Sequence, residues 1–200
     1  MDWDWDTIEP ILVDQIKRKP TFISGFHEIK NLLANQSLAE LFENVDEERL
    51  QAEFSDWVNK IFTKRFPKEV KSLYFGLFSM VEADNNSDDE ITTVYFCGST
   101  STPRDDDDWA CWTDNTYLPE NKYLVLTDFT ILDQNINLNS HIEGDLNVLI
   151  FHGLLNLLII NSLEQANNSL TATHKSLYLG SGYDGGDILI LGKLTKTGLV

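Results

Sequence analysis

Hydrophobic residues recur at helical spacing in two stretches of the first third of this 200-residue chain. The first stretch predicts a helix over residues 7–19, with Asp6 as its N-cap and a proline directly after it. The second predicts a longer helix over residues 47–66 that is capped by Asp46. Trp57 lies on the apolar stripe of this second helix, so we assign it to the core.

The region between these two helices has a weaker pattern. Residues 21–36 fit either a short helix or an irregular packed segment, and the sequence leaves both open. Ser37 and Glu40 have the spacing of a capping box, which predicts a short helix that ends near residue 42.

Farther along the chain, aromatic and β-branched residues gather in short runs that are typical of strands. Residues 70–81 and 91–97 form two such runs, and the polar connection between them predicts an antiparallel pair. Further strands are expected at residues 123–127, 175–179 and 187–191, the last two joined by the glycine-rich turn Gly180-Ser-Gly-Tyr-Asp-Gly-Gly.

One polar and one apolar segment complete the pattern. Residues 130–139 are polar and rich in asparagine, which predicts a loop. Ser140 and Glu143 form a second capping box, which predicts a helix that continues to about residue 164. Residues 148–160 of this helix are apolar nearly all round, so we expect it to be the most buried helix, with His152 as a core residue rather than a ligand or base.

Together these elements predict the fold class. A chain of this length is most simply one domain, which we place at residues 1–200. Helices, a group of strands, a helix and a final hairpin follow one another in this order. The expected fold is therefore α+β, with an antiparallel sheet packed against several helices and one strongly buried C-terminal helix.

The chain is strongly acidic, with a net charge of −17 that is concentrated in one region. Residues 82–120 hold 11 acids and one base, Arg104, and so carry a net charge of −10. Such a field repels nucleic acid and anionic lipid and attracts basic partners. We therefore expect no nucleic-acid partner and no membrane partner.

Two further features bear on location. The first residues of the chain are acidic, unlike a secretory signal, and the best apolar run is too short to span a membrane. Cys97 and Cys111 are the only cysteines, and their spacing fits no zinc pattern. We expect a cytoplasmic protein with reduced thiols, although the sequence alone does not decide whether the two cysteines form a disulfide.

The acidic charge meets aromatic side chains in residues 97–119, which we call the acidic–aromatic segment. Large aromatic side chains anchor protein interfaces, and acids around them steer a basic partner. The predicted partner-binding residues are Asp105, Asp106, Asp107, Asp108, Trp109, Trp112, Asp114 and Tyr117. A second orientation stays open, in which Trp109 and Trp112 turn inward and fix a long loop to the sheet.

Catalytic and metal chemistry has less support. Consecutive aspartates diverge, whereas calcium sites use alternating positions around a glycine turn, so we expect no metal site. The glycine-rich turn joins two strands and lacks the helix that a phosphate loop needs. The four histidines are scattered and no nucleophile elbow is present, so no catalytic residue and no cofactor is assigned.

Three stretches carry a resemblance to a known group: residues 73–79, residues 107–111 with residues 117–123, and residues 178–188. With these stretches the chain resembles uncharacterised bacterial proteins associated with polymorphic toxin systems. The last stretch is similar to the glycine-and-aspartate hairpin of the SUKH immunity superfamily. The resemblance covers about a quarter of the chain, and it implies an intracellular protein that binds and neutralises a toxin without catalytic residues of its own.

The leading hypothesis is a non-enzymatic binding protein of immunity type that covers a basic partner, such as a toxin domain, with the acidic–aromatic segment. A carboxylate-based or divalent-metal-dependent hydrolase is the alternative from another class. A homo-oligomer whose interface uses Trp3 and Trp5 is a third hypothesis.

Overall fold

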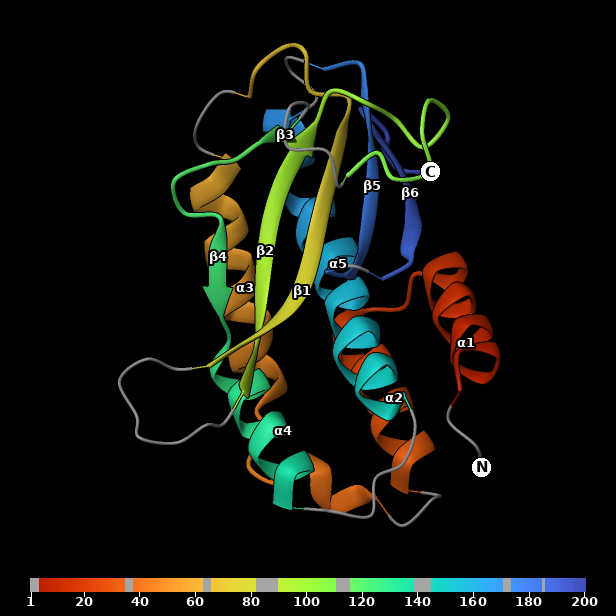
Figure 1. The fold of residues 1–200 in the computed structure, drawn as a ribbon, viewed down its shortest axis with the longest axis vertical. Helices are drawn as coiled ribbons and strands as arrows, with labels where there is room; N and C mark the ends of the chain where they lie inside the picture. Colours follow the sequence, from red (N-terminus) through yellow and green to blue (C-terminus); the bar gives the residue numbers. More distant parts are fainter. Residues whose placement is uncertain are drawn as a thin grey trace.

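The computed structural model describes residues 4–34, 38–62, 66–81, 90–110, 116–138, 145–170, 174–184 and 186–200. A seven-stranded sheet with helices packed against it forms the molecule, so the α+β class is confirmed (Figure 1). None of the helices in the described ranges is both long enough and apolar enough to cross a membrane.

The first third of the chain is helical. Its elements are α1 (Trp5–Arg18), α2 (Phe22–Ala34), the 3-10 helix η1 (Ala39–Phe42) and α3 (Glu47–Phe62). Helix α3 is capped by Asp46 as predicted, since its carboxylate accepts the backbone N–H groups of Glu48 and Arg49 at 3.0 Å. Trp57 is buried, also as predicted.

The start of α1 differs from the prediction. Asp4, rather than Asp6, is the N-cap, because the carboxylate of Asp4 accepts the backbone N–H of Thr7 at 2.9 Å. Asp6 lies instead in the first turn, where an acid suits the helix dipole. Residues 21–36, for which the sequence left a helix or an irregular segment open, contain the regular helix α2. Ser37 of the expected capping box lies outside the described residues.

The strands are β1 (Ser72–Val81), β2 (Glu90–Ser99), β3 (Thr116–Tyr117), β4 (Tyr123–Val125), β5 (Ser176–Tyr183), β6 (Ile188–Thr195) and β7 (Gly198–Leu199). Their order is β3-β2-β1-β5-β6-β7, and β4 pairs with β2. The predicted antiparallel pairs β1–β2 and β5–β6 are confirmed. The sheet is nevertheless mixed, because β1 and β5 pair in parallel after a long helical crossover.

Helix α4 (Thr127–Leu138) occupies the region for which a loop was expected, so that prediction is wrong. Its polar residues serve distant backbone groups: Asp133 accepts the N–H of Thr92 at 2.6 Å, and Asn135 donates to the carbonyl of Leu41 at 2.8 Å. Glu53 accepts the backbone N–H and hydroxyl of Thr127 and so caps the helix from α3. Tertiary contacts therefore outweigh the low helix propensity of this composition.

The C-terminal helical segment begins with a π-helical turn, η3 (Val148–His152), and continues as α5 (Gly153–Leu170). Every residue from 149 to 160 is buried, which confirms the expected burial of this helix. His152 is 1% exposed, as expected for a core histidine. The predicted capping residues Ser140 and Glu143 lie outside the described residues.

The two faces of the sheet differ. Alternate residues of β1, such as Phe75, join the main core with the helices, whereas Tyr74 belongs to a small separate cluster on the other face. Figure 1 shows α3 and α5 behind β1 and β2, with no helix in front of these strands. We call the second face the open face of the sheet.

Candidate functional site

Residues 100–110, which we call the acidic loop, leave the end of β2 as a series of turns. The carboxylate of Asp105 accepts the N–H and the hydroxyl of Thr102 at 3.1 and 3.0 Å. The carboxylate of Asp106 accepts the N–H of Asp108 at 3.0 Å. Asp105, Asp106, Asp107 and Asp108 are all exposed, so the loop presents four acids to solvent while two of them also hold its turns.

Trp109 points in the other direction. Its side chain is 1% exposed and packs edge-on against Tyr74, with the ring centroids 5.9 Å apart. A β-carbon at Gly180 would lie 2.7 Å from the indole Cζ2, so the absence of a side chain there makes room for the ring. Trp109 therefore has the inward orientation, and its prediction as an exposed partner contact is corrected.

Tyr117, another predicted contact, does not join the acidic loop. Tyr117 pairs with Gly98 across β3 and β2, and its ring lies 5.4 Å from that of Phe66 in the main core. It is half-buried on the helical side of the sheet, whereas Trp109 packs on the open face. Trp112 and Asp114 lie outside the described residues, as does Cys111.

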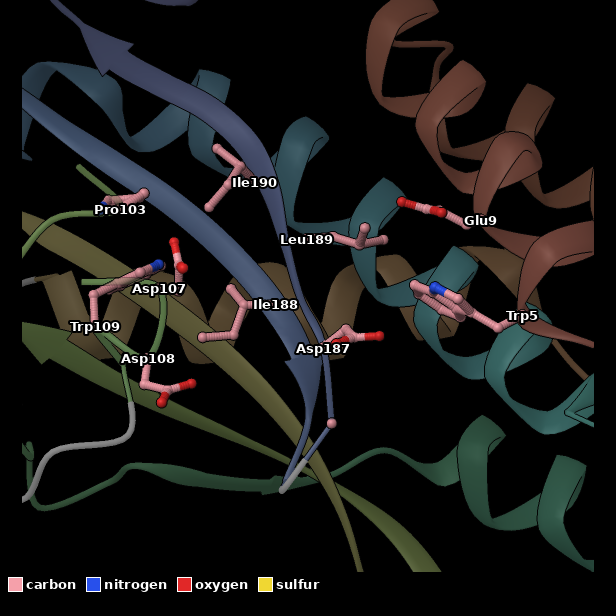
Figure 2. A pocket seen from close by; sticks show the side chains of 11 residues that line it. Trp5, Glu9, Pro103, Asp107, Asp108, Trp109, Asp187, Ile188, Leu189 and Ile190 are labelled. Atoms are coloured by element: carbon pink, nitrogen blue, oxygen red, sulfur yellow. The ribbon is translucent and has the colours of Figure 1, made fainter. Parts of the chain in front are cut away.

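A groove of about 500 Å³ lies between the acidic loop and helix α1, and we call it the β6 groove. Its floor is the start of β6, its first wall is the acidic loop and its second wall is α1 (Figure 2). The lining residues are Trp5, Glu9, Pro103, Asp107, Asp108, Trp109, Gly186, Asp187, Ile188, Leu189 and Ile190. Carboxylates from three separate segments therefore surround one groove.

The sequence predicted no site at Glu9, at Asp187 or at the first residues of β6, all of which line this groove. Asp187 was part of the recognised glycine-rich hairpin, but nothing local placed it beside the aspartate run. Glu9 is an exposed residue of α1 and carries no motif.

A buried polar cluster lies beneath the sheet next to this groove. Nε2 of His152 lies 2.9 Å from the hydroxyl of Ser181, which in turn donates to the side-chain carbonyl of Asn156 at 2.5 Å. Because the only hydroxyl proton of Ser181 is engaged by Asn156, His152 donates to Ser181 and does not act as its base. Burial lowers the pKa of His152 to about 4, so the ring is neutral at pH 7.

This cluster lacks the arrangement of a hydrolase. Ser181 is fully buried and no general base faces its proton, so it is a structural hydroxyl rather than a nucleophile. Within the described ranges, no three His, Cys, Asp or Glu side chains come close enough together to hold a metal ion.

The comparisons with known proteins identify no family. No protein-family model matches the chain, and no curated protein or solved structure gives a significant match. The relationship to immunity proteins therefore stays a prediction.

Proposed function

We propose that this chain is a non-enzymatic binding protein of immunity type, which covers a basic protein partner with the acidic loop. The observation that carries the proposal is the convergence of Asp107 and Asp108 with Glu9 and Asp187 around the β6 groove. Like charges repel one another, so gathering four carboxylates from three segments costs stability unless a cation balances them. A positively charged partner surface supplies that balance.

The proposed mechanism has two stages. The four exposed aspartates first attract a basic partner over a distance comparable to the Debye length, about 8 Å at physiological salt, and raise the association rate. The partner then settles over the groove and excludes water from it. Trp5, which is half-buried and lines the groove, replaces Trp109 as the aromatic contact in this second stage.

The setting we propose is the cytoplasm of a bacterium, where the resemblance to immunity proteins of toxin systems would apply. Occlusion of the partner's functional surface, rather than chemistry on it, is the proposed mode of neutralisation.

The experiment begins with co-purification of the tagged protein from its native cells at low salt, followed by association kinetics with the partner that is retained. The Asp107→Asn, Asp108→Asn double variant is the sharpest change, since Asp105 and Asp106 also hold the loop. We expect its association rate to fall by about threefold to tenfold at low salt, with a flatter salt dependence.

The matched control is the Glu40→Gln, Glu43→Gln double variant, which removes two exposed charges from η1 and the residue after it. Its association rate should stay close to that of the unaltered protein. An equal fall in both variants would mean that only net charge matters, and no fall in the first would contradict the assignment of the surface.

A further inference from the structure

The outer edge of strand β6 is open at the floor of the β6 groove. Strand β5 pairs with one side of β6, whereas β7 pairs on the other side only with Leu194 and Thr195. The next residue back, Lys193, exchanges two backbone hydrogen bonds with Val200. No described residue hydrogen bonds to the outer backbone edge of residues 188–191, so this edge is available to another strand.

The groove walls rise on both sides of this edge. In Figure 2, Ile188 and Ile190 point toward the acidic loop and Leu189 points toward α1. A strand added to β6 would continue this alternation, because successive side chains of a strand point to opposite faces of a sheet. One set of its side chains would approach Asp107 and Asp108, and the other set would approach Glu9 and Trp5.

We propose that the open edge of β6 binds an extended, positively charged segment of a partner protein by strand addition. This inference rests on the proposed function and specifies how the basic partner is held. Backbone hydrogen bonds to residues 188–191 supply the register, and the acids on both walls select cationic side chains. A segment with several consecutive Lys or Arg residues fits best, because consecutive residues reach both walls.

A buried donor in the groove supports a polar occupant. Nε1 of Trp109 is buried and has no hydrogen-bond partner, although the ring lines the groove. Figure 2 shows this nitrogen at the end of the ring that is turned toward Asp107 and Ile188. A small adjustment of the loop would let a carbonyl of the bound segment accept this N–H, and burying a donor without such an acceptor is unfavourable.

Charge favours a basic segment over a second copy of the chain as the strand that pairs with β6. Pairing β6 with β6 of another copy would bring Glu9, Asp107, Asp108 and Asp187 close to the same four residues of that copy. Each molecule also carries a net charge of −17. Like charges brought together in this way disfavour the dimer, whereas a cationic segment is attracted by the same groups.

Trp5 adds selectivity for the cation. It is half-buried on the α1 wall beside Glu9, so its ring can stack with a guanidinium group that also pairs with the Glu9 carboxylate. Arginine should therefore be preferred to lysine at the position that faces α1.

The experiment uses the full chain and a capped octapeptide, Thr-Thr-Lys-Arg-Lys-Arg-Thr-Thr, as the probe. Binding is followed by calorimetry at low salt, and amide hydrogen exchange is followed by NMR. We expect the exchange of outward-pointing amides in residues 188–191 to slow by about tenfold at saturation, while amides on the exposed face of α3 do not change.

A second peptide, N-methylated at its four central residues, keeps all the charges but lacks their amide donors. It should bind about tenfold more weakly if strand addition holds the peptide, because at least two hydrogen bonds are lost. Glu9→Gln should also weaken the unmethylated peptide, whereas the Glu40→Gln control should not.

Equal binding of the two peptides, or saturation without slower exchange at residues 188–191, overturns strand addition. Failure of the unmethylated peptide to bind also overturns strand addition. None of these results decides the proposed function, which is judged by the association rate of the folded partner. A further result is that the folded partner associates more slowly with the Asp107→Asn, Asp108→Asn variant and yet leaves amide exchange in β6 unchanged. That result would support the proposed function and contradict strand addition at β6.

Discussion

Trp109 packs over Gly180 so closely that a β-carbon at position 180 would lie 2.7 Å from the indole Cζ2. This contact joins the aspartate run to the glycine-rich hairpin, two features that are far apart in the sequence. Ser99 strengthens it, since its hydroxyl donates to the carbonyl of Trp109 at 2.6 Å. The inward tryptophan therefore fixes the end of the acidic loop on the open face of the sheet and leaves the aspartates outside.

Gly180→Ala should release this loop. The added methyl group clashes with the Trp109 ring, and overpacking of this kind costs about 1–3 kcal/mol of unfolding free energy. Urea unfolding would measure the loss. Arg104 is exposed in the same loop, so limited trypsin digestion should cleave faster after it in the variant.

Gly186→Ala is the matched control for this prediction. A β-carbon at Gly186 would have its nearest neighbour at 3.4 Å, which is ordinary van der Waals contact. Its stability and its rate of cleavage at Arg104 should stay close to those of the unaltered protein. Equal effects at both glycines would contradict the proposed contact.

The contact between Trp109 and Gly180 also shows which features could not be predicted from the sequence. The stripe of α3, the β1–β2 hairpin and the buried α5 were predicted, because each depends on periodicity within one segment. The orientation of Trp109 depends on a missing side chain in another strand. No local pattern could reveal that dependence, and the aromatic composition alone left both orientations open.

Helix α4 and the parallel β1–β5 pair were missed for a related reason. The polar residues that made residues 130–139 resemble a loop bind to other elements, as Asn135 does to the carbonyl of Leu41. The pairing of β5 depends on how the chain returns after α4 and α5. The β6 groove follows from that return, so Glu9 of α1 and Asp187, which directly precedes β6, could not be grouped with the aspartate run beforehand.

Ser181→Ala should destabilise the fold although it removes a single oxygen atom. The change leaves Nε2 of His152 and the side-chain carbonyl of Asn156 buried without their partner. Unsatisfied buried groups of this kind cost about 1–3 kcal/mol each, so we expect a loss of about 2–4 kcal/mol in urea unfolding. Ser176→Ala, at a half-buried position of the same strand, is the control and should change stability by less than about 0.5 kcal/mol.

Asp107→Asn, Asp108→Asn should have the opposite effect on stability. These two aspartates lie beside Asp105, Asp106 and the acids of the groove, so removing their charge reduces repulsion in the free protein. The melting temperature should rise at low salt, and the rise should disappear in about 1 M salt, where the Debye length is about 3 Å. A lower melting temperature at low salt would show that these carboxylates stabilise the loop and would weaken the case for a binding role.

His152 should make the protein less stable in mild acid. Burial lowers its pKa in the folded protein to about 4, while the unfolded chain has the ordinary value of about 6.5. Between these values the unfolded chain binds a proton that the folded protein does not, so stability is complete above about pH 6.5 and falls as the pH drops toward 4. The contribution amounts to about 3 kcal/mol at the lower end of this window.

Urea unfolding from pH 7 to pH 4 would measure this loss, with His152→Gln as the comparison. Glutamine can still hydrogen bond to Ser181 but does not titrate, and the carboxylates titrate alike in both proteins. The difference in unfolding free energy between the two proteins should therefore shrink by about 3 kcal/mol as the pH falls, even if the variant is the less stable protein at pH 7. Parallel curves would mean that water reaches the ring in the folded state, which is incompatible with the burial of His152 beneath β5.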